Sequence, residues 1–284
     1  MVYLDYFNFP TADMEHDFFM SVKGKCYNTF YPFQVLSDRG LTRLDFEPIT
    51  ILYGGNGSGK STALNIIAEK IGVTRDSIFN KSNFYPDYVS LCTIHILTNI
   101  PKQSRIITSD DVFDYMLNIR NLNEGIDLKR EDLFDEYLDA KYSNFQMESM
   151  ADYDRLAKVV KSRSKTQTRF VKSELMANVR EFSNGESAYR YFTEKINENA
   201  LYILDEPENS LSPQRQLELA GFIADSARFY GCQFIISTHS PFLLAMKGAK
   251  VYDLDENPAT VKPWTSLKNV RVYHDFFKQH QDAF

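Results

Sequence analysis

A lysine and two hydroxyl residues follow a run of glycines in the segment ILYGGNGSGKST, residues 51–62. Gly54 is separated by four residues from Gly59, Lys60 and Ser61, which is the spacing of the P-loop pattern. Glycines in such a loop let successive backbone N–H groups point at phosphate oxygens. Lys60 would reach the β- and γ-phosphates, and the Ser61 hydroxyl would bind Mg²⁺. The segment therefore predicts a triphosphate site, against the alternative of a glycine-rich turn that matches by chance.

Two adjacent carboxylates end an apolar run in a second segment, LYILDEPENSLS, residues 201–212. Asp205 is placed to hold Mg²⁺ through water, and Glu206 is placed to orient or deprotonate an attacking water. Transfer of a phosphoryl group to water needs one group for the metal and one for the nucleophile. The alternative is a surface turn with solvated acids.

His239 follows the apolar run in the segment QFIISTHSP. A lone histidine is more often structural than functional. Its position just after a predicted strand, at the edge where α/β sheets bind ligands, favours a contact with the γ-phosphate.

The segment EFSNGES, residues 181–187, supports two interpretations. Ser183 and Glu186 have the spacing of a capping box, so the segment predicts a well-capped helix start. A helix N-terminus that carries a serine hydroxyl and a glycine N–H is also an anion site. Both interpretations can hold together.

The elements that must position these groups form an α/β pattern. Ile49, Ile51 and Leu52 predict a buried strand before the P-loop, and an amphipathic helix is predicted after it by Leu64, Ile67, Ala68 and Ile71. Ser212-Pro213 can start a helix and Gly231 can end it. That helix lies between two apolar runs, which makes a strand–helix–strand unit with parallel strands.

Composition limits the kinds of protein and the cellular compartments that are consistent with the sequence. A chain of 284 residues suffices for one large domain or for a core with an insertion. Its net charge of −6 indicates no overall attraction to nucleic acid. Cys26, Cys92 and Cys232 have no metal-ligand spacing, which suits a reducing cytoplasm. Neither a membrane-spanning apolar run nor a signal peptide is recognisable, so the sequence predicts a cytoplasmic protein without a membrane partner.

Taken in order, ILYGGNGSGKST, EFSNGES, LYILDEPENSLS and IISTHSP resemble the Walker A, signature, Walker B with D-loop, and H-loop motifs of ABC-type ATPases. The chain is more similar to the RecF/SMC-like branch than to transporter subunits, and within that branch to short bacterial ATPases with an FSNGES signature and an LDEPE Walker B. The resemblance is close over residues 44–72 and 180–256. It implies a P-loop NTPase fold of the α/β class: an ABC-type ATPase head with a central, mainly parallel sheet and a helical insertion.

The resemblance also implies roles for individual residues, with ATP and Mg²⁺ as ligands. In the catalytic step it implicates Lys60, Glu206 and His239, the last as a sensor of the γ-phosphate. Ser61, Asp205 and Asp110 would lie at the metal. Ser183 and Gly185 would act on the ATP of a second subunit in a head-to-tail homodimer, and residues 209–212 would cross its interface. The remaining contacts to the phosphates are expected from Gly54, Asn56, Gly57, Ser58, Gly59 and Thr62.

Two departures from the family pattern stand out. Asn184 and Glu186 occupy positions where the common signature has Gly and Gln, which leaves the rate of hydrolysis open. No glutamine ends the strand predicted in RIITSDDVFDY, so Ser109 or Asp110 is expected near the metal in place of the usual Q-loop residue.

The chain is expected to divide into an N-terminal part of the ATPase core at 1–110, a helical insertion at 111–180 and a C-terminal part of the core at 181–284. Within the insertion, KSRSKTQT resembles a flexible loop. Its basic strip between residues 155 and 172 is either a solvated face or a surface for DNA, RNA or an acidic partner. The basic residues are Arg155, Lys158, Lys161, Arg163, Lys165, Arg169 and Lys172.

Two functions remain open from the sequence. The first is an ATPase in nucleic-acid maintenance or anti-phage defence. The second is a slow, nucleotide-gated regulatory subunit that controls a separate effector protein such as a nuclease or toxin. A transporter subunit is a weaker third, because nothing in the chain suggests coupling to membrane domains.

Overall fold

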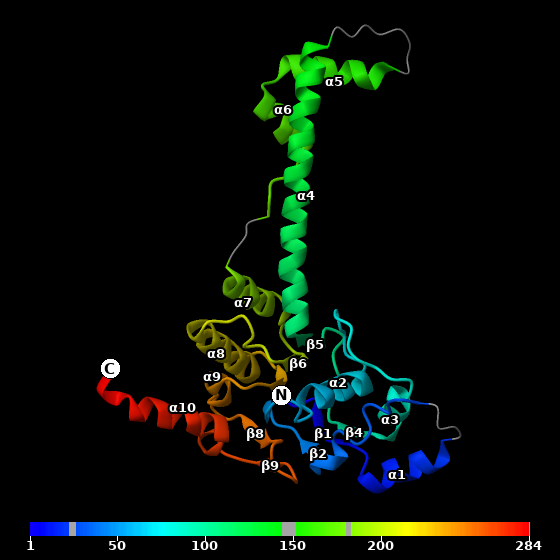
Figure 1. Ribbon diagram of the computed structural model, residues 1–284, viewed down its shortest axis with the longest axis vertical. Coiled ribbons are helices and arrows are strands. Elements are labelled where there is room, and N and C mark those ends of the chain that lie inside the picture. Colours follow the sequence, from blue (N-terminus) through cyan, green and yellow to red (C-terminus); the bar gives the residue numbers. More distant parts are fainter. Residues whose placement is uncertain (23–26, 144–151, 180–182, 284) are drawn as a thin grey trace. The chain divides into compact units, whose positions relative to one another are not determined.

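The computed structural model describes residues 1–22, 27–143, 152–179 and 183–283. It contains two compact units, shown with their elements in Figure 1. Unit 1 comprises Met1–Phe113 and Asn184–Phe284, and unit 2 comprises Asp114–Ser183.

A central sheet organises unit 1. In the described part of the chain it has six strands, all parallel to their neighbours except the last, which runs antiparallel to β8. The predicted α/β fold with a mainly parallel sheet is therefore confirmed. In spatial order the strands are β5 (Arg105–Thr108), β6 (Leu201–Asp205), β7 (Gln233–Ser237), β3 (Ile49–Tyr53), β8 (Lys250–Asp253) and β9 (Thr260–Val261).

The central strands are rich in apolar residues, as expected where both faces of a sheet are covered. Every residue of β3 and of β7 is buried, as expected for parallel strands between two layers. Since β3, β6 and β7 are parallel, their carboxyl ends meet at one edge of the sheet. The P-loop, the acidic pair and the segment with His239 follow these three strand ends.

Two helices attached to these strands begin and end as their sequences predict. Helix α2 (Lys60–Ile71) starts directly after the P-loop and buries Leu64 and Ile67. Helix α8 (Pro213–Phe229) starts at Ser212, whose side chain accepts a hydrogen bond from the Arg215 backbone N–H. The chain leaves α8 through Gly231, which has a φ of +65°.

A second, antiparallel sheet covers part of unit 1. Strand β1 (Leu4–Asn8) lies between β2 (Arg43–Asp45) and β4 (Thr93–Ile96). The buried side chain of Gln233 in β7 joins it to the central sheet: Oε1 accepts from the backbone N–H groups of Tyr3 and Leu4, and Nε2 donates to the Leu4 carbonyl.

The remaining helices of unit 1 are short. They are α1 (Ala12–Ser21), α3 (Tyr85–Leu91), α7 (Asn184–Lys195), α9 (Pro241–Leu244) and α10 (Lys268–Gln279), with 3₁₀ turns at Ser37–Arg39, Trp264–Ser266 and Gln281–Ala283. Cys92 and Cys232 are buried free thiols, and Cys26 lies outside the described residues. Within the described residues, no helix has the length and apolar character needed to cross a membrane.

Unit 2 is built from helices. Helix α4 (Ser109–Tyr142) begins in unit 1 and is followed by α5 (Tyr153–Ser164) and α6 (Gln167–Glu174). A small core joins α4 to α6 through Leu133, Tyr137, Phe170 and Val171.

The prediction of a flexible loop at KSRSKTQT is wrong. Helices α5 and α6 occupy most of it, and only Lys165 and Thr166 lie between them. The Tyr137 hydroxyl donates to the Lys165 carbonyl, which anchors this short connection to α4.

Candidate functional site

The P-loop needs glycine for two different reasons. A β-carbon on Gly54 would lie 2.5 Å from Ser58 Oγ, because the Ser58 side chain packs against the loop. Gly59 has a φ of +93°, in the left-handed region that residues with a side chain rarely adopt. A side chain at either position would therefore disturb the loop just where α2 begins.

Lys60 is buried within the curve of this loop. Its side chain is 4% exposed, and Nζ donates to the carbonyls of Gly54 at 2.8 Å and Gly55 at 3.1 Å. Burial lowers the pKa of the Lys60 ammonium, and nearby Glu206, at 3.9 Å, acts in the opposite direction. The ammonium is thus bound mainly by neutral carbonyls, which leaves it suited to an anionic ligand.

A cavity of about 260 Å³ lies over the loop. The structure brings together seven of the residues that the sequence predicts for phosphate binding, and adds Glu206 to them. The seven are Asn56, Gly57, Ser58, Gly59, Lys60, Ser61 and Thr62.

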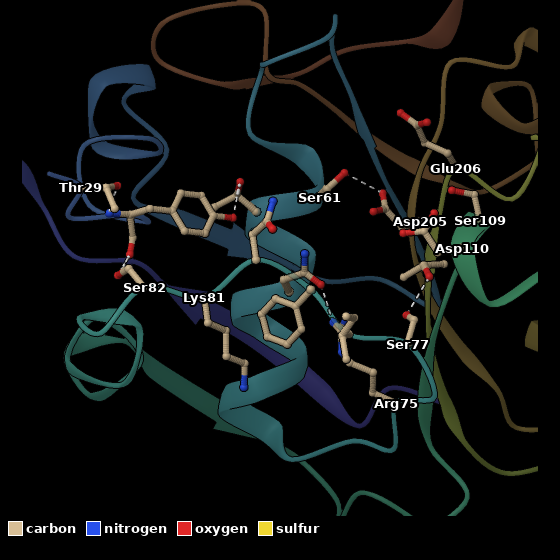
Figure 2. A pocket seen from close by; sticks show the side chains of 17 residues that line it. Thr29, Ser61, Arg75, Ser77, Lys81, Ser82, Ser109, Asp110, Asp205 and Glu206 are labelled. Atoms are coloured by element: carbon tan, nitrogen blue, oxygen red, sulfur yellow. Dashed lines mark hydrogen bonds between the residues drawn. The ribbon is translucent and has the colours of Figure 1, made fainter. Parts of the chain in front are cut away.

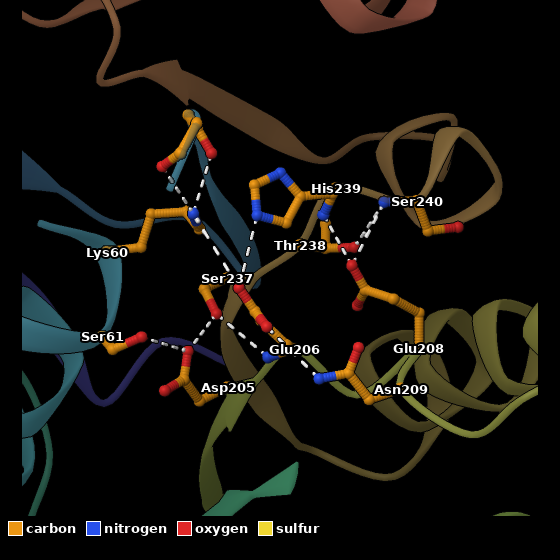
Figure 3. A network of polar contacts seen from close by, with 12 residues as sticks. Lys60, Ser61, Asp205, Glu206, Glu208, Asn209, Ser237, Thr238, His239 and Ser240 are labelled. Atoms are coloured by element: carbon orange, nitrogen blue, oxygen red, sulfur yellow. Dashed lines mark hydrogen bonds and ion pairs between the residues drawn. The ribbon is translucent and has the colours of Figure 1, made fainter. Parts of the chain in front are cut away.

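Asp205 lies at the end of β6 beside the first turn of α2. Its Oδ1 accepts hydrogen bonds from Ser61 Oγ at 3.1 Å and from Ser237 Oγ (Figure 3). Burial raises the pKa of the Asp205 carboxyl, and these hydrogen bonds partly offset the rise. A carboxylate and a hydroxyl oxygen this close together are ligands of the kind that Mg²⁺ prefers.

Glu206 has a constrained backbone and a defined side-chain position. Its φ is +49°, unusual for a residue other than glycine, and its N–H donates to both the carbonyl and the hydroxyl of Ser237. Asn209 Nδ2 donates to Oε2 at 3.2 Å, and His239 Nε2 lies 3.3 Å from Oε1. Figure 3 shows Glu206 between Lys60 and His239. Such backbone outliers cluster at functional sites.

Three residues that sequence reasoning missed support this site. Ser237 Oγ donates a hydrogen bond to Asp205 Oδ1 and accepts one from the Glu206 backbone N–H. Glu208 Oε1 accepts from the backbone N–H groups of His239 at 2.6 Å and Ser240 at 3.2 Å, while burial raises the pKa of the Glu208 carboxyl. Asp255 Oδ1 accepts from the Gly55 N–H at 2.7 Å. Glu208 and Ser237 belong to the segments LYILDEPENSLS and IISTHSP, but their hydrogen bonds form only because β6 pairs with β7.

A larger cavity, of about 750 Å³, adjoins the acidic pair. It is lined by Ser61, Asp205, Ser109 and Asp110, so Asp110 lies on the side of the site where the metal is expected (Figure 2). No group of three or more His, Cys, Asp or Glu side chains suited to a metal occurs among the described residues.

The far wall of the larger cavity carries positive charge and aromatic surface. The Arg75 guanidinium stacks over the Phe79 ring at 4.0 Å and donates to Asn65, and burial lowers its pKa. The Tyr31 hydroxyl donates to Thr62 Oγ1 at 3.1 Å, which attaches this wall to the start of α2. Sequence reasoning had assigned no role to Arg75.

The signature residue Gly185 lies elsewhere in unit 1 and lines neither cavity in the described part of the chain, whereas Ser183 belongs to unit 2. Gly185 belongs to the first turn of α7, and a β-carbon on it would lie 3.1 Å from the Ser210 carbonyl oxygen. The first two residues of EFSNGES lie outside the described residues.

This fold and this site define a P-loop nucleoside triphosphatase: a glycine-rich loop joins a parallel strand to a helix, and an acidic pair ends a nearby strand. Family comparison narrows the class further. The model of the family described as ABC transporter matches residues 43–209, more than half of the chain, so the chain belongs to this family. A second model, described as an AAA domain and AbiEii toxin of a type IV toxin–antitoxin system, matches residues 177–245.

Solved structures with a similar arrangement have low sequence identity. The Smc head domain from Pyrococcus furiosus, solved with an extended coiled coil and the C-terminal domain of ScpA, is 14% identical over 82% of this chain and 94% of its own, with a TM-score of 0.41. A dimeric ATP-binding cassette bound to ADP and phosphate is 13% identical over 79% of this chain and 90% of its own, with a TM-score of 0.36. These similarities are too low to transfer a function. Among curated proteins, no sequence matches the chain significantly.

Proposed function

We propose that the chain is a Mg²⁺-dependent ATPase that hydrolyses ATP between two copies of itself. The observation that carries this proposal is the position of Glu206. Its carboxylate lines the phosphate cavity beside Lys60, receives a hydrogen bond from Asn209, and lies 3.3 Å from His239 Nε2.

The residues around the cavity have complementary tasks. The P-loop N–H groups and Lys60 hold the β- and γ-phosphates, and His239 contacts the γ-phosphate. Glu206 accepts a proton from the attacking water as the bond from the γ-phosphorus to the bridging oxygen breaks. Ser61 and Asp205 hold Mg²⁺, with Asp110 nearby, and the ion would neutralise charge that develops on the phosphate oxygens.

The second copy completes the site. Ser183 and Gly185 act on the ATP bound by the partner, and residues 209–212 cross the interface. This proposal is supported by the close approach of Gly185, in the first turn of α7, to the Ser210 carbonyl, because it brings two of the proposed interface segments together. A helix N-terminus is also a favourable site for an anion.

The first candidate setting is anti-phage defence or nucleic-acid maintenance, which rests on the motif resemblance; the family model over residues 177–245 names only a toxin–antitoxin system. The second candidate function is a slow, nucleotide-gated subunit that controls a separate nuclease or toxin. It is favoured by Asn184 and Glu186 at signature positions. Turnover that rises sharply with DNA supports the first candidate, whereas slow turnover with a tightly co-purifying protein supports the second.

The decisive experiment measures ATP turnover and ATP affinity of Glu206→Gln. We expect kcat to fall by about 10²- to 10⁴-fold, the usual contribution of a general base, with ATP affinity retained. Lys60→Ala is the matched variant, because it should weaken ATP binding itself. A Glu206→Gln variant that hydrolyses ATP at the wild-type rate would contradict the assignment of Glu206 as the general base.

A further inference from the structure

An apolar groove lies on unit 1 between the C-terminal helix and the segments that follow β6 and β7. Its volume is about 840 Å³, and we call it the C-terminal groove. Its apolar walls are formed by Phe242, Trp264, Val270, Tyr273 and Phe277. At its polar end it is lined by Asn209 and His239, the residues that contact Glu206.

Helix α10 contributes one wall of the groove and is poorly covered by the rest of unit 1. Val270 is its buried residue, whereas Val272, Tyr273, Phe276 and Phe277 are 60%, 46%, 53% and 53% exposed. In Figure 1 the helix, drawn in red, extends away from β8 and β9. Contiguous apolar surface of this kind, rimmed by polar residues, marks an interaction site.

The charges beside the groove are mainly positive. Helix α10 carries Lys268, Arg271 and Lys278 against one acid, Asp275, although the whole chain has a net charge of −6. Hydrogen bonding by His274, together with Arg271 and Lys278, lowers the pKa of Asp275, which reports the local positive field. Arg271 and His274 also line the groove.

Among the described residues that line the groove, Glu208 is the one carboxylate. Glu208 is turned to the backbone N–H groups of His239 and Ser240. The groove therefore offers apolar pockets with cationic side chains beside them.

We propose that the C-terminal groove docks an amphipathic helix of another protein, whose apolar side chains enter the groove and whose Asp and Glu residues meet Arg271 and its neighbours. Apolar anchors at helical spacing are the usual way in which a helix occupies such a groove. A second copy of α10 fits less well, because it would bring like charges together.

This surface goes beyond the proposed ATPase, although Asn209 at its polar end also belongs to the proposed dimer interface, and its test uses no nucleotide. The probe is a designed, fluorescently labelled peptide of about 18 residues, long enough to form a helix, with Leu and Phe on one face and Glu beside them. A matched peptide has Lys in place of Glu. Fluorescence anisotropy measures the binding of each peptide to the full chain.

We expect the Glu peptide to bind at least about tenfold more tightly than the Lys peptide, and Arg271→Glu to reverse this preference. The double variant Tyr273→Ser with Phe277→Ser should abolish binding; both side chains are about half exposed, so folding should be preserved. Phe229→Ser is the control, because Phe229 is 65% exposed and lies outside the groove.

Three results would overturn the proposal. The two peptides could bind equally, or the groove variant could bind the Glu peptide as tightly as the Phe229 control does. Light scattering could also show a nucleotide-independent dimer that the groove variant abolishes, which would assign the groove to a second copy. A normal ATPase rate in that case would leave the proposed function intact.

Discussion

Gly59 and Gly72 flank the same helix with the same kind of backbone but different surroundings. Their φ angles are +93° and +69°, both left-handed. A β-carbon on Gly59 would lie 2.8 Å from Leu36 Cδ2, whereas one on Gly72 would meet nothing within 4 Å. Replacement of either glycine should therefore destabilise the fold through backbone strain, whereas only replacement of Gly59 should disturb the phosphate cavity.

We expect Gly72→Ala to lower the free energy of unfolding by about 1–2 kcal/mol, the cost of left-handed backbone with a side chain, and Gly59→Ala to lower it further because its β-carbon also overlaps Leu36 Cδ2. Only Gly59→Ala should weaken ATP binding, because its backbone lies in the P-loop. Chemical denaturation and calorimetric titration with ATP measure the two effects. Equal ATP affinities for the two variants would contradict the prediction.

Glu208 is predicted to position His239 without touching the substrate. Glu208→Ala leaves the His239 N–H without its acceptor, at about 1–3 kcal/mol, whereas the Ser240 N–H keeps the Thr238 hydroxyl at 3.0 Å. We expect kcat to fall, with KM for ATP little changed, because the segment with His239 loses its anchor. Steady-state kinetics provides the measurement.

Glu208→Gln is the conservative partner, since its side-chain carbonyl still accepts hydrogen bonds from these N–H groups. It should restore most of the activity that the alanine variant loses. If it is as impaired as Glu208→Ala, the charge of Glu208 is needed in its own right and the positioning role is wrong.

At the scale of elements, α7 and the segment at residues 209–212 touch through their backbones. Gly185 and the Ser210 carbonyl approach so closely that a β-carbon would be at 3.1 Å. Any shift at the start of α7 must therefore move this segment. If both form the interface of the proposed dimer, substitution of Gly185 should impair assembly.

The prediction uses Glu206→Gln as the background, because ATP should then bridge two copies without being consumed. Light scattering at micromolar concentration should show a dimer with ATP. Gly185→Ala in that background should reduce it, whereas Gly221→Ala, with no neighbour within 4 Å, should not. A trapped variant that stays monomeric would mean that the start of α7 has only a structural role.

Elements with a strong local pattern were predictable from the sequence. Strand β3, the P-loop and α2 are adjacent in the chain, as are β6, α8 and β7, and each carries its own apolar periodicity and caps. The antiparallel sheet was not predicted, because β1, β2 and β4 are far apart in sequence and pair only in the fold. The same limit applies to the site: adjacent Asp205 and Glu206 were recognised, but Ser237 became visible only through strand pairing.

Helix α6 lies within the predicted helical insertion, but its start was assigned to the loop KSRSKTQT. Its start is polar and its apolar residues are few, but Phe170 and Val171 are buried against Tyr137 and Leu133 of α4. Such packing overrides weak local propensity. The 34-residue length of α4 likewise could not be derived from a sustained heptad pattern.

At the scale of the whole molecule, the chain is acidic, and basic charge is concentrated in the strip at residues 155–172 of unit 2. The structure neutralises part of the strip internally: Lys158 pairs with Glu136 at 3.0 Å, and Lys161 pairs with Glu174. Within the described residues, Arg169 and Lys172 are exposed and form no hydrogen bond or ion pair. The strip therefore contains lysines that are paired with carboxylates, Lys158 and Lys161, and basic residues that are available to a ligand, Arg169 and Lys172.

If the strip contacts phosphates, binding must weaken steeply with salt, because each bound phosphate releases counterions. Replacing Lys161, Arg163, Lys165 and Arg169 by Ala should leave basal ATP turnover intact, since none of these residues is assigned to nucleotide binding or to the dimer interface. It should reduce binding to DNA, RNA or an acidic effector. For duplex DNA it should also lower the slope of log affinity against log salt by about 0.9 for each phosphate that the variant no longer binds.

A matched pair of double variants sharpens this prediction. Arg169→Ala with Lys172→Ala removes two available charges, whereas Lys158→Ala with Lys161→Ala removes two that already have carboxylate partners. The first pair should reduce DNA affinity and its salt slope more than the second, because a paired lysine must leave its partner before it can bind a phosphate. Binding curves over a salt series compare the two. Identical curves for both variants and the wild type would make the strip a solvated face, and the partner of this ATPase would bind elsewhere.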